Sequence, residues 1–585
     1  MEARVNTLAK RTKKDLISPE EEELKRFRYD FLCDYRNEAK WREQADLDGD
    51  FYDGNQWTEE EKQVLKERGQ PAVTINRIKP RMDAIFGIQQ ALRVDTKAYP
   101  AHDKEQEAEA ISERLREIED DCDFDELETL VFEDQAIAGR GWFELKKEWD
   151  GLRSRHKIAH LDFREVVKDR YSKKPDLSDA KRVSKTVMTE LEDAKALFPE
   201  FEEQIEACVD AKYFESYGQG SPHKNILGDQ YKSGSVDAHY QDYNDFVDRE
   251  RKRLRLVTMY YRGQTPQKYF YFPGEEPMDV TDMDEKSMET LAQAKPGGTV
   301  ETQWKKTLNC VVFCWGQILE HKKDIRPHDV DAKFPLILTP GYIERKTGRE
   351  YGLIRQMRDP QCEVNKRRSK LIHLITVNRV EYEKGAFEDP AKARAEYVKP
   401  DGFIERRQGF QVTVANNLEL SQTHYMLLQQ ATQEIDQSAA GREVEGRSNS
   451  SSGREFQLRQ QQATQPIRKL FSNLRAARRR VALYLLDEIL REFPDLQTTK
   501  YDIVIEEAPE SLNLNAETFE TLVQLANNSK VPVPLDMLIK VSPLSGTIKK
   551  EFIERLQQQE QQQQALMAQQ QEMMMQQQAA KAAGQ

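Results

Sequence analysis

The residues best suited to binding a metal ion lie in an acidic segment near the N-terminus. Asp46, Asp48 and Asp50 alternate with other residues, as ligands do at the start of a calcium-binding loop. Such a loop needs Gly at its sixth position, where this chain has Phe51, and a bidentate Glu at its twelfth, where it has Trp57. The pattern therefore favours a solvated acidic loop over this segment and predicts no metal site.

The cysteines could in principle form disulfides or bind zinc. All six are spread along the chain, so a disulfide framework is not expected. Cys310 and Cys314 occur in Cys-Val-Val-Phe-Cys, without a second Cys or His pair at zinc spacing. Residues four apart in a strand share one face, so we interpret this pair as buried core thiols. His321 and His328 are too far apart for a metal pair on a helix.

Motifs for enzymatic chemistry are missing from the sequence. No Gly-x-x-x-x-Gly-Lys-Ser/Thr segment occurs, nor any Gly-Lys pair, which excludes a P-loop motor. The acidic cluster at residues 120–125 could hold magnesium in a nuclease, but such clusters more often cap helices or face solvent. We therefore predict no catalytic residues, no metal and no cofactor, and we expect that the chain is not an enzyme.

The composition is that of a protein with much solvated surface. The chain has 585 residues, 33% of them charged, and a net charge of -13. It has no apolar run near the roughly 20 residues that span a bilayer, and its first ten residues lack the apolar core of a secretory signal, so we expect a cytosolic product and no membrane. The acidic charge argues against a tight grip on DNA, yet an acidic wall that repels phosphate would let DNA slide past.

The elements that would position these residues change in type along the chain. Helical patterns cover residues 20–42, 78–86 and 105–132. From Gly141 onward, runs rich in β-branched and aromatic residues are separated by Gly, Pro and Asp, which predicts strands. The predicted strands are residues 142–148, 157–167, 255–262, 268–272 and 308–319.

Helical patterns return in the C-terminal half. Asp359 is suited to capping a helix and Pro360 to its first position, so a helix is predicted over residues 360–379. Short strands are predicted at 402–405, 410–414 and 501–505, and helices at 418–440, 454–493 and 516–527, the second interrupted at Pro466. Residues 557–585 are low in complexity, with 14 Gln among 29 residues. The fold class predicted is α+β.

Four groups of segments occur in a characteristic order. They are Phe51-Tyr-Asp-Gly-Asn-Gln-Trp57 with Gly69-Gln-Pro-Ala-Val-Thr-Ile-Asn-Arg-Ile-Lys-Pro80 and Ile85-Phe-Gly-Ile-Gln89; Asp169-Arg-Tyr-Ser-Lys-Lys-Pro-Asp-Leu-Ser-Asp-Ala180; Tyr351-Gly-Leu-Ile-Arg-Gln-Met-Arg-Asp-Pro-Gln361 with Asn365-Lys-Arg-Arg-Ser369; and Gly446-Arg-Ser-Asn-Ser-Ser-Ser-Gly453 with Gln457-Leu-Arg-Gln460. Together they resemble the portal, or head-to-tail connector, proteins of tailed double-stranded DNA phages, particularly the large type of short-tailed phages. The chain departs from the family pattern at Arg170, where Pro is expected, and at Pro466, inside an expected helix.

The resemblance implies a portal fold with a fixed order of regions. These are a wing (1–342), a stem helix leading to the clip (343–379), a small α/β clip (380–417), a second stem helix (418–440), a tunnel loop (441–453), a long wing helix (454–500), a mainly helical crown (501–556) and a Gln-rich C-terminal barrel helix or disordered tail (557–585). It also implies a dodecameric ring at a capsid vertex of the virion, assembled in the host cytoplasm. Its implied partners are double-stranded DNA in the channel, the large terminase subunit, a head-completion or tail adaptor protein, and coat and scaffolding proteins.

Two sets of residues are candidates for contacts in such a ring, one with DNA and one between neighbouring copies. Those predicted to touch DNA in the channel are Lys366, Arg367, Arg368, Lys370, Arg442, Arg447, Ser448, Asn449 and Ser450, although a solvated helix face with ion pairs and an exposed turn would give the same pattern. Those predicted to contact neighbouring copies are Ile467, Leu470, Phe471, Leu474, Val481, Met573, Met574 and Met575. The alternative function is a helical viral scaffold or adaptor protein without a DNA channel, and a nuclease is the third.

Overall fold

The computed structural model describes most of the chain between residues 19 and 507. The described residues are 19–91, 94–100, 105–149, 151, 154–209, 245–272, 277–281, 283–284, 287–288, 290–291, 298–327, 329, 331–376, 379–397, 402–415, 418–438, 467–492 and 501–507. The chain divides into two compact units, residues 1–90 with 96–504, and residues 91–95 with 505–585. Nearly all described residues belong to the first unit, which mixes helices and antiparallel sheets as an α+β fold does.

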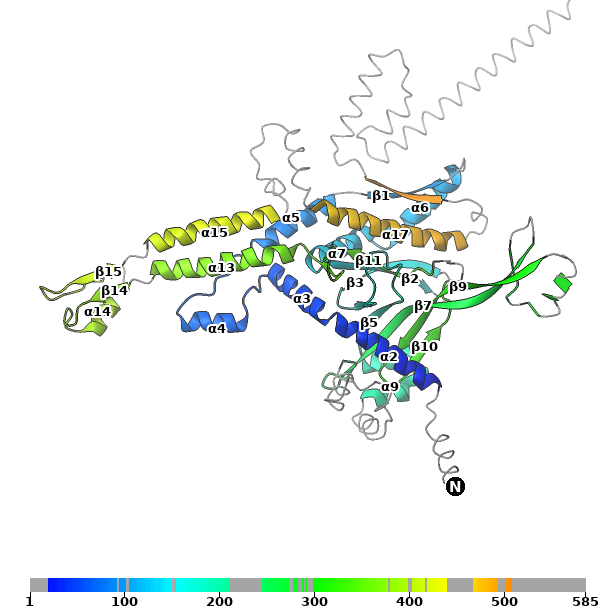
Figure 1. Ribbon diagram of the computed structural model, residues 1–585, viewed down its shortest axis with the longest axis horizontal. Helices are drawn as coiled ribbons and strands as arrows, with labels where there is room; N and C mark the ends of the chain where they lie inside the picture. Colours follow the sequence, from blue (N-terminus) through cyan, green and yellow to red (C-terminus); the bar gives the residue numbers. More distant parts are fainter. Residues whose placement is uncertain are drawn as a thin grey trace, which may run out of the picture. The chain divides into compact units, whose positions relative to one another are not determined.

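The largest sheet has seven antiparallel strands (Figure 1). They are β4 (Val166–Lys168), β5 (Arg182–Glu190), β6 (Val247–Asp248), β7 (Arg253–Tyr271), β8 (Met278–Asp279), β9 (Thr299–Phe313) and β10 (Ile318–Lys322). Their order is β10-β9-β7-β5-β4, and β6 and β8 pair with β7. The two strands predicted at 255–262 and 268–272 are one strand, because Gly263 and Pro266 stay in register with β9 on an exposed stretch of the ladder.

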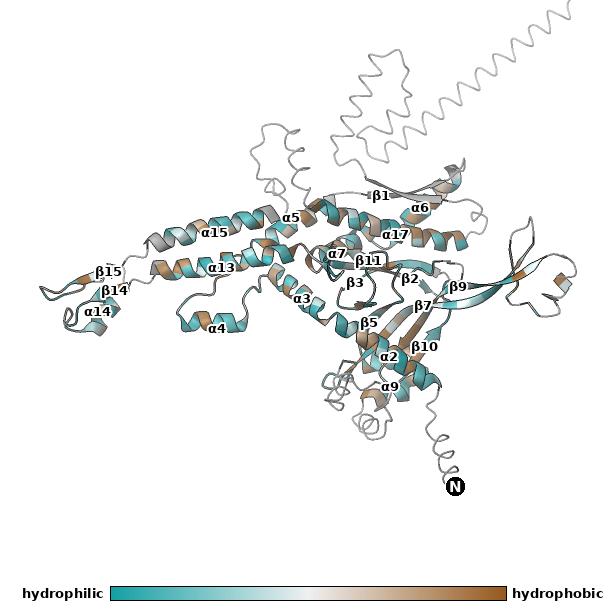
Figure 2. Ribbon diagram, viewed as in Figure 1, coloured by the Kyte–Doolittle hydropathy of each residue, from teal (hydrophilic) through white to brown (hydrophobic). Residues whose placement is uncertain are grey.

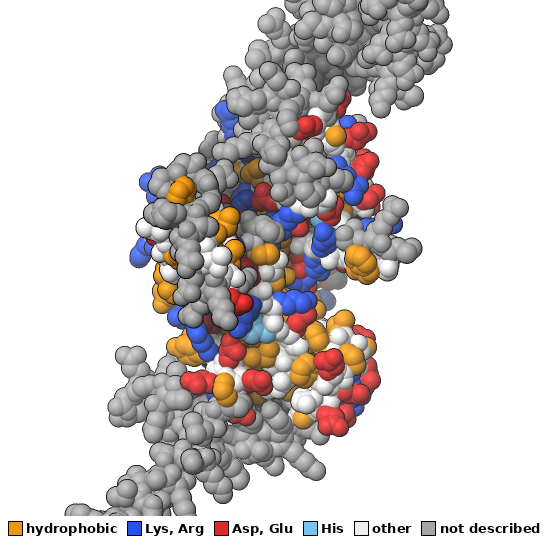
Figure 3. All heavy atoms as spheres, turned by 90° about the vertical axis from the view of Figure 1, so that its right-hand side faces the viewer, with side chains coloured by type: hydrophobic (Ala, Val, Ile, Leu, Met, Phe, Trp, Pro, Cys, Tyr) orange, Lys and Arg blue, Asp and Glu red, His pale blue; other side chains and the backbone are white. Residues whose placement is uncertain are grey.

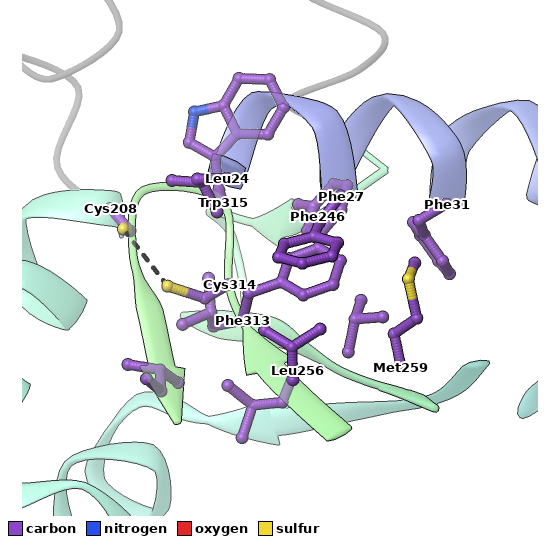
Figure 4. Close-up of a cluster of buried hydrophobic side chains, with 14 of the residues drawn as sticks. Leu24, Phe27, Phe31, Cys208, Phe246, Leu256, Met259, Phe313, Cys314 and Trp315 are labelled. Atoms are coloured by element: carbon purple, nitrogen blue, oxygen red, sulfur yellow. Dashed lines mark hydrogen bonds between the residues drawn. The ribbon is translucent and has the colours of Figure 1, made fainter. Parts of the chain in front are cut away.

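A helix covers this sheet with an apolar stripe. In α2 (Pro19–Asn37), Leu24, Phe27 and Phe31 recur at helical spacing and are buried in one cluster with strand residues such as Val257 and Phe313 (Figure 4). Figure 2 shows hydrophobic residues concentrated on the strands next to this helix. The helix and the sheet therefore form one core.

One of the two predicted core thiols, Cys314, belongs to the same cluster. Cys314 follows β9 and is buried, and its Sγ lies 3.9 Å from the Sγ of Cys208 in α9 (Glu202–Val209) (Figure 4). Burial raises the pKa of the Cys310 thiol to about 11, which keeps it protonated and unreactive at neutral pH. None of the six cysteines is in a disulfide, as the sequence predicted.

A second core lies around a three-stranded sheet in the order β11-β2-β3. Its strands are β2 (Arg140–Trp149), β3 (Ser154–Leu161) and β11 (Leu336–Pro340), and its helices are α6 (Glu105–Asp121), α7 (Phe124–Ile137) and α17 (Arg468–Glu492). Phe124, Phe143 and Val481 are among the side chains buried there. At Gly141 a side chain would meet the backbone oxygen of Val131 at 2.1 Å, so only Gly allows α7 to lie this close to β2.

The acidic segment predicted as a loop is a helix. α3 runs from Ala39 to Asp53 and ends at Gly54, whose left-handed φ of 97° allows its N–H to bond the Asp50 carbonyl. Trp41, Ala45, Asp48 and Phe51 are its buried residues. Their spacing of three or four residues gives a helical stripe that the density of acidic residues concealed.

The remaining elements are shorter or flank the two cores. They are α4 (Glu59–Glu67), α5 (Ile78–Ala91), α8 (Leu191–Leu197), a 3-10 turn (Pro199–Phe201), α13 (Ile354–Thr376), α14 (Pro390–Tyr397), α15 (Leu418–Ser438), the paired strands β12 (Tyr342–Ile343) and β13 (Glu350–Tyr351), β14 (Arg379–Tyr382) and β15 (Val412–Ala415), and β1 (Val94–Pro100) and β16 (Tyr501–Glu507). β16 confirms the strand predicted at 501–505. Within the described parts of the chain, every helix is too short or too polar to span a bilayer.

Candidate functional site: the paired helices α13 and α15

Two long helices lie side by side and are joined by a small α/β segment (Figure 1). β14 and β15 form an antiparallel pair from Arg379↔Ala415 to Tyr382↔Val412, and α14 lies between them in sequence. The sequence predicted both helices, but the strand predicted at residues 402–405 is not formed. α13 also begins earlier than predicted, so Pro360 lies inside it. Ile354 and Met357 are fully buried, and this packing outweighs the missing backbone hydrogen bond of Pro360.

A row of polar side chains on α13 holds an extended stretch of backbone. Gln361, Asn365 and Ser369 are four residues apart, so they lie on one face of the helix, and all three are buried. They accept hydrogen bonds from every second backbone N–H of residues 73–77. The distances are 3.1 Å from Arg77 N to Gln361 Oε1, 3.0 Å from Ile75 N to Asn365 Oδ1 and 3.1 Å from Val73 N to Ser369 Oγ.

We call this row the polar ladder. Gln56 completes it, because its Oε1 accepts hydrogen bonds from Gln361 Nε2 at 2.9 Å and from Asn365 Nδ2 at 2.6 Å. The ladder therefore joins the segments 51–57, 69–80 and 361–369, which the sequence singled out separately. Sequence reasoning missed the ladder because a polar residue at every fourth position also fits a helix face in water. The signal available was the extended backbone of 73–77, which needs partners for its N–H groups.

A buried ion-pair cluster fixes the start of α13. Asp48 of α3 has no exposed surface, and its carboxylate lies 3.3 Å from Arg355 Nη2 and 3.2 Å from Arg358 Nε. Burial raises the pKa of the Asp48 carboxyl to about 6, and the two guanidinium groups oppose that rise. Asp48 is thus an anchor for α13 and neither a calcium ligand nor part of a solvated loop.

The four basic residues of α13 that were predicted to touch DNA do not form one patch. Lys366 bonds Glu61 of α4 at 3.0 Å, and Arg367 is paired with Glu363 one turn before it. Arg368 and Lys370 have no ionic partner among the described residues. At 3.6 residues per turn, two positions apart along a helix means about 200° around it, so these two side chains leave opposite sides of α13.

Three of these four basic side chains line an open groove between α13 and α15. It has a volume of about 480 Å³ and is lined by Asp359, Cys362, Glu363, Lys366, Arg367, Lys370 and His424. Arg368 is absent from the lining, as its position on the helix requires. The groove mixes both signs of charge, and Figure 3 shows the same mixture on another face, where Lys and Arg lie among Asp and Glu. Such a groove offers scattered positive charges and is not a continuous phosphate-binding wall.

Several predicted site residues lie outside the described residues. They are Arg442, Arg447, Ser448, Asn449, Ser450, Met573, Met574 and Met575. The predictions made for them stay predictions.

The apolar residues at the start of α17 and along it were predicted to contact neighbouring copies. Ile467, Leu470, Phe471, Leu474 and Val481 are buried inside the chain's own core. Phe471, for example, lies 5.1 Å from Phe132 of α7, centroid to centroid. Burial within one chain leaves these side chains no surface for a neighbouring copy. An amphipathic stripe fits an internal core and an interface equally well, and the sequence could not tell them apart.

Buried charge on the same helix was not foreseen. Arg478 is 3% exposed and donates to Glu128 at 2.9 Å and to Glu119 at 3.0 Å. These pairs join α17 to α7 and α6, so the charge of Arg478 serves internal packing.

Within the described residues, no group of three His, Cys, Asp or Glu side chains is placed to hold a metal ion.

Comparison with known proteins identifies the family of this chain. A comparison with curated proteins gives no match. The family model described as phage P22-like portal protein matches residues 25–493 and 491–585. The order of the four sequence segments and this match over nearly the whole chain agree, and the chain belongs to the phage P22-like portal protein family.

Proposed function

We propose that copies of this chain close into a ring at one capsid vertex, and that double-stranded DNA passes through its hole during packaging, retention and ejection. The observation that carries the proposal is the family match over nearly the whole chain. Proteins of this family are structural and not enzymatic, so the function depends on the geometry of the assembly and not on catalysis. The paired helices α13 and α15 support the proposal, because rigid rods lying side by side are suited to lining a hole.

The finer assignments follow the resemblance. Twelve copies would form the ring, with residues 343–379 and 418–440 as stem helices and 380–417 as the clip. The clip would dock the large terminase subunit and later a head-completion or tail adaptor protein, and the wing (1–342) would meet coat and scaffolding proteins. Residues 441–453 would form the tunnel loop, 454–500 the long wing helix, 501–556 the crown and 557–585 the barrel. Assembly would take place in the host cytoplasm.

Imaging of the purified chain tests the proposal directly. Negative-stain images are expected to show rings with a central hole wide enough for duplex DNA, and sizing is expected to show one closed oligomer. The rival function, a helical scaffold or adaptor without a channel, predicts particles without such a hole. A chain that stays monomeric at high concentration and with its capsid partners present would contradict the proposal.

The DNA-facing side of α13 can be found with two single substitutions. Arg368 and Lys370 lack ionic partners among the described residues and leave opposite sides of the helix, so only one can face the hole. One of the variants R368Q and K370Q, and not the other, is expected to reduce the salt dependence of duplex binding by assembled rings. The reason is that each lost phosphate contact lowers the slope of log K against log salt.

The matched control is K366Q, since Lys366 already pairs with Glu61. It is expected to leave the slope nearly unchanged. Equal effects at Arg368 and Lys370, or an effect at neither, would mean that α13 does not present one side to DNA.

A further inference from the structure

The side of α15 that faces away from α13 is exposed and nearly uncharged. Ala431 and Ile435 are buried, and the opposite face carries Met426, Gln429, Gln430 and Gln433, all exposed. No Lys, Arg, Asp or Glu occurs from Ser421 to Gln433. A third of the whole chain is charged, so such a face differs from an ordinary solvated one.

Two large side chains stand out on this stretch. Met426 is 69% exposed and Tyr425 is 51% exposed. Protein interfaces are enriched in Tyr and Met and depleted of charge at their centre. A phosphate-binding surface requires Lys or Arg, which this stretch of α15 lacks. The face therefore fits a protein partner better than DNA.

Next to α13 lies a helix in which no residue is fully buried. α4 has nine residues, none of them buried, and its Val64 is 42% exposed. A capping box from Thr58 and Glu61 begins it, and the Lys366–Glu61 ion pair ties it to α13. A helix this short is marginal in water without tertiary packing. α4 therefore presents a surface on which something else can pack.

These two surfaces have the arrangement that a ring needs. Figure 1 shows α4 and α15 on opposite sides of α13. In a cyclic assembly each copy uses two different patches, one for each neighbour. Gln side chains donate and accept hydrogen bonds, so the Gln-rich face of α15 can pair with both the Glu and the Lys residues of α4.

We propose that the α15 face around Met426 of one copy packs against α4, around Val64, of the next copy. The inference rests on the proposed ring and names the two surfaces that close it.

Cross-linking of assembled rings tests this pairing. The double variant V64C/M426C, treated with a short bis-maleimide, is expected to give a ladder of covalent dimers, trimers and larger species on a denaturing gel. Each single variant is expected to give no such ladder, because like patches do not meet. The wild-type chain controls for the six native cysteines, and L197C/M426C controls for general exposure, since Leu197 of α8 is 63% exposed.

The outcomes separate this inference from the proposed function. Wild-type rings without a ladder from V64C/M426C would overturn the pairing and leave the ring intact. Dimers from M426C alone would show that like patches meet, which also overturns it. Protection of the thiol of the M426C variant from a maleimide by duplex DNA would place this face in the hole, against the inference. Absence of rings in images of the wild type would instead defeat the proposed function.

A charge pair gives a second test. M426E is expected to raise the protein concentration for half-assembly by about tenfold, the equivalent of about 1.4 kcal/mol, because the introduced carboxylate would meet the acidic helix α4. Adding V64K to the same chain is expected to restore assembly, and M426L to leave it unchanged. A V64K/M426E chain no better than M426E would contradict the pairing.

Discussion

Replacing Arg140 by Met is expected to destabilise the folded chain by about 3–5 kcal/mol, because the change breaks two buried ion pairs at once. Among the described residues, it leaves Glu38 with Arg42 alone and Glu350 with Lys168 alone. Arg140 is 1% exposed, and it donates to Glu38 at 2.6 Å and to Glu350 at 2.9 Å. Its guanidinium also lies 3.6 Å from the ring centroid of Trp41. The measurement is the free energy of unfolding in urea at one fixed protein concentration.

Two controls show whether the effect comes from buried charge. R164M removes an exposed ion pair with Asp46, and is expected to change the free energy of unfolding by less than about 1 kcal/mol. The double variant R140M/E38Q removes the Glu38 carboxylate as well and keeps the buried Lys168–Glu350 ion pair, 2.6 Å long, so it is expected to recover part of the loss. If R140M is no worse than R164M, the cluster does not hold the elements together.

The Arg140 cluster shows what sequence reasoning could not reach. Glu38 and Glu350 are 102 and 210 residues from Arg140 in the chain, and they join α2 and α3 to β2 and β13. Nothing local distinguishes these charges from the many charges that face solvent. Only the fold decides which of them meet.

Local patterns predicted the elements better than their contacts. Cap residues predicted most of α13, and a run of β-branched and aromatic residues predicted β2. The strand predicted at 308–319 is instead the end of β9, a turn and the start of β10. Two further predictions were wrong, the loop in place of α3 and the interface along α17. The buried stripe of α3 contains Asp48, and the stripe of α17 packs inside its own chain. In both cases the partner of the residue, and not its type, decided its role.

Replacing Asn365 by Leu is expected to loosen the middle of residues 73–77 on α13 and to lower the free energy of unfolding by about 1–3 kcal/mol. The substitution removes the acceptor of the Ile75 N–H, and a buried group left without a partner costs about 1–3 kcal/mol. Gln56 Oε1 loses the donor at Asn365 but keeps the one at Gln361 Nε2, 2.9 Å away. Hydrogen exchange at the Ile75 amide is the local measurement, and it is expected to become faster than in the unchanged chain.

The variant N365D separates the polar ladder from general damage to α13. Asp keeps an oxygen that can accept the Ile75 N–H but loses the donor to Gln56 and buries a negative charge beside Gln56 Oε1. Stability is therefore expected to fall as well, whereas exchange at Ile75 is expected to stay near that of the unchanged chain. A volume effect of Leu alone would leave the Ile75 amide protected in both variants. If protection persists in N365L, the extended segment is held by its flanking residues, and the ladder is a consequence of the close approach of the two segments and not its cause.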